Sequence, residues 1–213
     1  MRARRHLSGL RKSASRRLLT LRVPIIPLSP PLSQDSDRLV AYTVIESWNL
    51  WSGFCRSLYV SCAIGAVTEG GHRISHLQPI GSAATDAILF AANVGRNKPL
   101  QSGRVTPRDE PAWQDPHALM RVVRALGASN EAQISAGLSL QSDVYKRMPT
   151  IRNFFAHRGE VSAQKAAGVA RSLALNPSLR PSDLVVSCRS RRPQNVLADW
   201  IDDLRASIEI ACQ

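Results

Sequence analysis

The sequence lacks several features that would place it in a familiar class of protein. No apolar run approaches the ~20 residues that cross a bilayer, so we expect no membrane span. The four cysteines form no C-x-x-C pair and follow no secretory signal, which favours a reducing, cytoplasmic environment over a disulfide framework or zinc site. There is no internal repeat and no glycine-rich phosphate loop. We therefore expect neither a cofactor nor a metal.

Acidic residues are missing from the first 34 positions, which hold eight of the basic residues that give the chain its formal net charge of +12. Residues 23–34 include four prolines and are unsuited to a regular helix. We predict a basic, proline-rich arm and linker over residues 1–34 that meets nucleic acid or an acidic surface. The alternatives are a solvated tail, an over-long gene start and an organellar transit peptide.

Residues 35–213 have the apolar periodicity of helices. A long helix is predicted to begin at Ser36 or Asp37, with an inward stripe that includes Trp51, Cys55 and Cys62. Gly53 interrupts its polar row and would permit close approach of another helix, for example at a dimer seam. We expect an all-α domain, a helical bundle of five to seven helices.

Capping residues define two of the other predicted helices. Asp115 begins one of them and Gly127 ends it. Asn195 caps the final helix, which turns its apolar positions inward. Asp199, Asp202 and Asp203 are predicted to form a solvated acidic face on that helix.

The most informative stretch is IRNFFAHRG, residues 151–159. Asn153 and His157 are four apart, so on a helix they share a face and the amide can fix the tautomer of the imidazole. Arg152 lies one position away, and its planar fork can reach a phosphate beside the histidine. Such a group can hold a phosphodiester and move a proton. The alternative is an ordinary surface pair of Arg152 and His157.

The surrounding residues predict how this group is presented. Phe154 and Phe155 would bury the opposite side of the turn. Pro149 breaks the preceding helical pattern and is suited to the first turn of a short motif helix. Gly159 is suited to the left-handed cap after the last turn.

Arg152-Asn153-Phe154-Phe155-Ala156-His157 resembles the R-N-x-x-x-H motif of the HEPN superfamily, small all-helical domains that include many metal-independent ribonucleases. The resemblance implies RNA cleavage by attack of the 2′-OH, with His157 moving a proton and Arg152 stabilising charge on the phosphate. The expected products are a 2′,3′-cyclic phosphate and a 5′-OH. It also implies a homodimer that brings two Arg152/His157 sets to one groove.

Further site residues are expected around this motif. In HEPN domains the first helix commonly supplies a polar residue to the motif, for which Glu46 and Asn49 are the candidates. Candidate RNA contacts are Arg56, Arg147 and Arg158. Two further functions remain open: a non-catalytic module that binds RNA, a nucleotide or a protein, and a toxin or phage-defence effector held silent by an antitoxin or regulatory partner.

Overall fold

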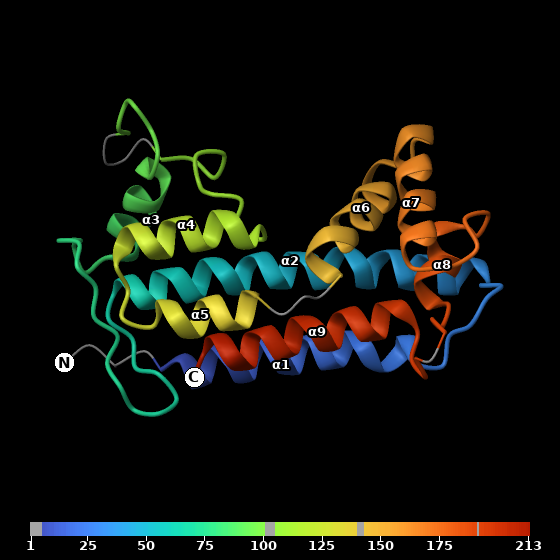
Figure 1. Cartoon of the computed structure of the whole chain (residues 1–213), viewed down its shortest axis with the longest axis horizontal. Helices are drawn as coiled ribbons and strands as arrows, with labels where there is room; N and C mark the ends of the chain where they lie inside the picture. The colour runs from blue at the N-terminus through green and yellow to red at the C-terminus, as the bar shows by residue number, and fades with distance from the viewer. Residues whose placement is uncertain (1–5, 101–104, 140–142, 191) are drawn as a thin grey trace. The chain divides into compact units, whose positions relative to one another are not determined.

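The computed structural model describes residues 6–100, 105–139, 143–190 and 192–213, which form an all-α fold (Figure 1). The prediction of a helical bundle is confirmed, although these described residues form nine α-helices instead of five to seven. The α-helices are α1 (Leu7–Arg22), α2 (Gln34–Ala63), α3 (Ala84–Asn93), α4 (Pro116–Leu126), α5 (Glu131–Leu138), α6 (Val144–His157), α7 (Glu160–Ser172), α8 (Pro181–Val186) and α9 (Val196–Ala211).

The chain divides into two compact units. Unit 1 consists of Met1–Ala14, Trp51–Leu140 and Ser207–Gln213, and unit 2 consists of Ser15–Leu50 and Gln141–Ala206. The predicted division into an arm of residues 1–34 and a domain of residues 35–213 therefore does not coincide with the boundaries of either unit.

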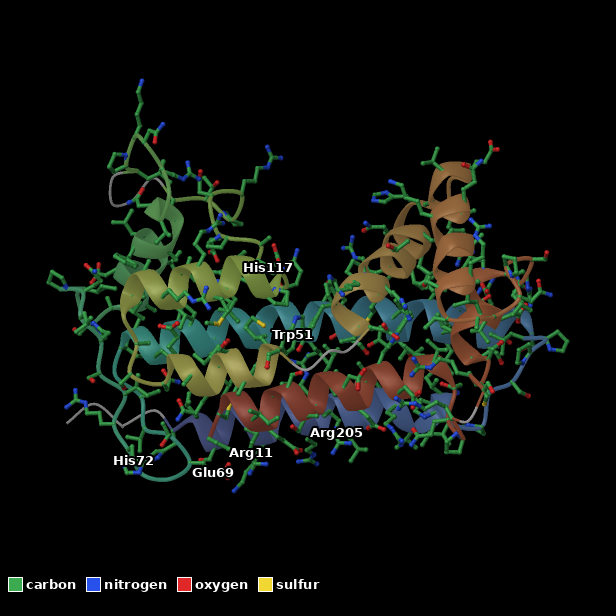
Figure 2. The ribbon with its side chains drawn as sticks, in the orientation of Figure 1. Arg11, Trp51, Glu69, His72, His117 and Arg205 are labelled. Carbon is green, nitrogen blue, oxygen red and sulfur yellow. The ribbon has the colours of Figure 1, made fainter. Side chains whose placement is uncertain are left out.

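The basic N-terminal segment is helical and packed, which differs from the flexible arm that we predicted. Leu7 and Leu18 of α1 are 1% and 0% exposed, and the Leu7 amide donates to the Val67 carbonyl at 2.9 Å. Arg11 donates to the Glu69 carboxylate at 2.6 Å, and the two side chains meet in Figure 2. The segment was misjudged because its many cations conceal a helical row of small and apolar residues, namely Leu7, Leu10, Ala14, Leu18 and Leu21.

Unit 1 contains the predicted inward stripe of α2. Trp51, Cys55 and Cys62 are all buried, and burial raises the pKa of the Cys62 thiol to about 12, so this thiol is neutral. The predicted ends of α4 are confirmed. The Asp115 side chain accepts from the His117 amide at 2.9 Å, and Gly127 closes the helix at φ 67°.

Unit 2 contains the predicted cap of α9, but the acidic face of this helix is not simply solvated. The Asn195 side chain accepts from the Ala198 amide at 2.9 Å, which confirms the cap. Asp199 is only 8% exposed and accepts from Arg189 at 2.6 Å, while Asp202 pairs with Arg22 at 2.8 Å. These pairs could not be seen in the pattern of α9 because both arginines come from distant segments.

Two helical glycines allow a direct test of packing. An added Cβ at Gly137 in α5 would lie 2.8 Å from the Ser207 carbonyl and 3.0 Å from the Ala211 amide of α9, whereas one at Gly53 in α2 would meet nothing within 4 Å. The close approach predicted at Gly53 is therefore not made within the chain. Alanine is favoured over glycine by about 0.5–1 kcal/mol inside a helix.

We expect Gly53→Ala to raise the free energy of unfolding by about 0.5–1 kcal/mol, because it gains helix propensity without a clash. Gly137→Ala should lower it by about 1–3 kcal/mol, because backbone atoms must move. Urea unfolding followed by circular dichroism measures both values. The same sign for the two variants would contradict the packing of α5 against α9.

Candidate active site

The predicted motif lies in α6, which packs along α7 within unit 2 (Figure 1). Contrary to the prediction, Pro149 neither breaks the pattern nor starts a short helix, because α6 runs through it from Val144 to His157. A proline inside a helix costs about 3 kcal/mol. A continuous buried stripe on both sides of the proline offsets this cost, and it consists of Val144, Met148, Ile151 and Phe155.

The polar residues of the motif lie away from this buried stripe. Arg152 is half-buried, whereas Asn153 and His157 are exposed. The Arg152 Nη1 donates to the Asn153 Oδ1 at 3.3 Å, so the amide oxygen receives the guanidinium. The predicted bond from Asn153 to His157 is replaced by this contact between sequence neighbours. Arg152 is thereby held at one end of the polar face, with its Nε buried and without a partner among the described groups.

His157 is the last residue of α6, and its side chain is exposed. Within the described residues its ring makes no hydrogen bond or ion pair, so both ring nitrogens can meet a ligand. The apolar base beneath it is the one expected. Phe155 is 6% exposed, and the rings of Phe154 and Phe155 meet edge to face with centroids 5.4 Å apart.

The end of α6 is one residue earlier than predicted. Arg158, not Gly159, adopts the left-handed conformation, with φ 44°. Its amide donates to the Phe154 carbonyl at 2.7 Å, and its side chain lies 3.7 Å from the Asp37 carboxylate. Gly159 is extended and begins α7, where its amide donates to Ser162 Oγ at 3.1 Å. The turn to α7 therefore follows His157 directly.

The predicted supporting residues on α2 have other surroundings. Glu46 accepts from Arg17 of α1 at 3.3 Å, and Asn49 is exposed. No described hydrogen bond joins either side chain to Arg152, Asn153 or His157. The structure thus does not link this pair to the motif.

The three predicted RNA contacts all have protein partners. Arg56 belongs to unit 1 and pairs with Glu110 at 2.6 Å. Arg147 pairs with Asp143 at 2.5 Å and also donates to the Ser172 carbonyl at 3.1 Å. Arg158 has only the long contact to Asp37 and is the most accessible of the three to an anion.

The hairpin of α6 and α7 is more basic than the motif alone suggests. Residues 144–172 contain six basic residues and one acidic residue. Three exposed cations here were not among the predicted contacts: Lys146, Lys165 and Arg171. Counting charge on the segments that flank the motif would have found them. This surface attracts a polyanion to the side chains of Arg152 and His157.

The described residues contain no group of three or more His, Cys, Asp or Glu side chains that could hold a metal ion. None of the described helices has both the length and the apolar character needed to span a bilayer. Compared with protein-family models, curated proteins and solved structures, the chain has no match in any of the three.

Proposed function

We propose that the chain is a metal-independent endoribonuclease of the HEPN type, whose active residues are Arg152 and His157 of α6. The observation that supports this most is the exposed, unpartnered imidazole of His157 on the same helix as the anchored guanidinium of Arg152. The excess of positive charge on α6 and α7 supports RNA as the substrate.

The chemistry needs few groups because RNA supplies its own nucleophile, the 2′-OH. His157 removes the proton of this hydroxyl or gives a proton to the leaving 5′-oxygen. Arg152 keeps N–H groups beyond the one used by Asn153, and these bind the nonbridging phosphate oxygens as charge develops on them. The products are a 2′,3′-cyclic phosphate and a 5′-OH.

One imidazole performs only one of the two proton transfers. A second copy of the chain supplies the other His157, as in the ribonucleases that the motif resembles, so the proposed active form is a homodimer. Cleavage by a protein that stays monomeric at the assay concentration would contradict this composite site.

The test is incubation of purified protein with mixed total RNA in EDTA, followed by end-group analysis of the fragments. Wild type and the control His117→Ala, which alters an exposed histidine of unit 1, should give cyclic phosphate ends. His157→Ala and Arg152→Ala should give none. Equal cleavage by His157→Ala would refute the assignment.

A binding module without catalysis is the second candidate, and one observation favours it. No described group orients the His157 ring, since Asn153 is engaged by Arg152. This function predicts that RNA binds to wild type and to His157→Ala alike, with no cleavage by either. A role as a toxin or phage-defence effector adds an antitoxin or regulatory partner to the ribonuclease proposal. It predicts poor growth on expression of the wild type that Arg152→Ala relieves.

A further inference from the structure

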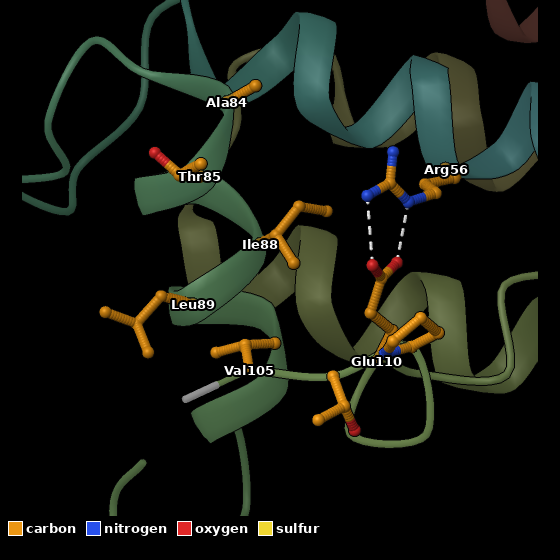
Figure 3. A pocket seen from close by; sticks show the side chains of 9 residues that line it. Arg56, Ala84, Thr85, Ile88, Leu89, Val105 and Glu110 are labelled. Atoms are coloured by element: carbon orange, nitrogen blue, oxygen red, sulfur yellow. Dashed lines mark hydrogen bonds and ion pairs between the residues drawn. The ribbon is translucent and has the colours of Figure 1, made fainter. Parts of the chain in front are cut away.

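Unit 1 contains a pocket of about 390 Å³ that the ribonuclease proposal does not use (Figure 3). Its wall is built from Arg56 of α2, one side of α3 and the loop that carries Val105 and Glu110. Ligand pockets of about 300–1,000 Å³ are typical for small molecules, so this one is suited to a small ligand.

One end of the pocket is an ion pair in which the two partners are unequally occupied. Arg56 donates from Nε to Glu110 Oε2 at 2.6 Å and from Nη2 to Oε1 at 2.9 Å, as Figure 3 shows. Glu110 Oε2 also accepts from Trp113 Nε1 at 2.7 Å. Both carboxylate oxygens are therefore engaged, whereas three of the five guanidinium N–H groups remain. This end can donate to a ligand oxygen.

Both groups of the pair stay charged at neutral pH. The hydrogen bond from Glu110 raises the pKa of Arg56, and the one from Arg56 lowers the pKa of Glu110. The Arg56 side chain is 47% exposed, against 13% for that of Glu110. The accessible partner is thus the cation.

The other end of the pocket is aliphatic. Ile88 and Leu89 project from α3, with Val105 and Pro107 from the loop. The described lining has no aromatic ring on which a nucleobase could stack and no second cation to balance a dianion. A nucleotide or a phosphorylated sugar therefore fits poorly, and a hydrocarbon chain with a singly charged head fits well.

We propose that this pocket binds a small aliphatic monocarboxylate of about six to ten carbons. The carboxylate pairs with the free N–H groups of Arg56, and the hydrocarbon displaces water from Ile88, Leu89 and Val105. The site is independent of the motif on α6, because none of its lining residues belongs to unit 2.

The test is calorimetric titration of the protein with butanoate, hexanoate and octanoate, and with 1-octanol as the uncharged match. Each added CH₂ should tighten binding about fourfold until the pocket is full. Octanol should bind at least about tenfold more weakly than octanoate, because it forms no ion pair. Equal affinity for the two, or no saturable binding by folded wild type up to about 10 mM, would overturn the proposal.

Two variants locate the site. Arg56→Gln should weaken octanoate at least about tenfold. Ala84→Trp fills the pocket from an exposed position in the first turn of α3 and should abolish binding without disturbing the ion pair. Arg96→Gln, which removes a different Arg–Asp pair of unit 1, is the control and should leave the affinity unchanged. Octanoate binding that survives Ala84→Trp would place the ligand elsewhere and overturn the proposal.

Discussion

Replacing His157 by alanine is expected to lower the rate of RNA cleavage by about 10²–10⁴-fold, the range for loss of a general acid or base. The fold should not change, because the side chain is exposed and surface substitutions typically alter the unfolding free energy by less than about 0.5 kcal/mol. The rate is measured on a labelled RNA in EDTA, and thermal unfolding is measured on the same sample.

Arg152 variants separate positioning from charge. Arg152→Ala should cost about 10²–10³-fold in rate, as for a lost donor to a developing oxyanion. Arg152→Lys should recover only part of this, because an ammonium keeps the charge but lacks the planar fork. Arg38→Ala, on an exposed arginine of the same unit, is the matched control and should cleave at the wild-type rate. Loss of activity in that control would show that general charge matters more than the motif.

Asp183→Asn is expected to destabilise the protein by about 2–4 kcal/mol, because it disrupts a buried, charge-assisted network. Asp183 is 5% exposed and accepts from the Leu32 amide at 2.9 Å and from Arg180 Nε at 2.7 Å. Arg180 also donates to the Leu32 carbonyl at 3.0 Å. The pair therefore holds both backbone groups of Leu32, and the amide variant cannot accept all these bonds with a full charge.

The effect should depend on pH with a definite sign. Burial acts to raise the pKa of Asp183, but the hydrogen bonds from Arg180 and the Leu32 amide outweigh it and hold the pKa below the usual 3.8. A carboxylate with a lowered pKa stabilises the fold above its unfolded-state pKa and loses that contribution as pH falls through the folded-state value. The difference between wild type and Asp183→Asn should thus be full at neutral pH and shrink below about pH 4.

Asp35→Asn provides the matched control, since Asp35 and Arg38 are also an Asp–Arg pair three residues apart. The Asp35 side chain is 94% exposed and lies 3.4 Å from its arginine. Such pairs contribute at most about 1 kcal/mol, so this variant should unfold nearly like wild type in urea. A loss equal to that of Asp183→Asn would mean that burial around Leu32 is not what makes the difference.

Local signals in the sequence were sufficient where the structure depends on near neighbours. The caps at Asp115, Gly127 and Asn195 are made within three residues or within one helical turn, and all three were predicted. The run of α6 through Pro149 was not predicted, because buried contacts on both sides of the proline overcome a local preference. The helix α1 was missed because charge composition was given more weight than apolar spacing.

The partners of the site residues were less accessible from the sequence. Arg56 and Glu110 are 54 residues apart, and no pattern in either segment predicts their pairing. The Arg152 contact to Asn153 depends on a choice between rotamers that helical spacing leaves open. Positions on a helical face can be predicted, therefore, but the choice among several polar partners requires the fold.

The make-up of unit 1 has a consequence for how the protein is made. The unit takes residues from the two ends of the described chain as well as from its middle, and Ala211 and Cys212 are among its buried residues. A ribosome adds about 5–20 residues per second, so Trp51 leaves the tunnel many seconds before its last neighbours in the core are synthesised. During translation, this unit must wait with exposed apolar surface, and helpers that shield nascent chains should matter most for it.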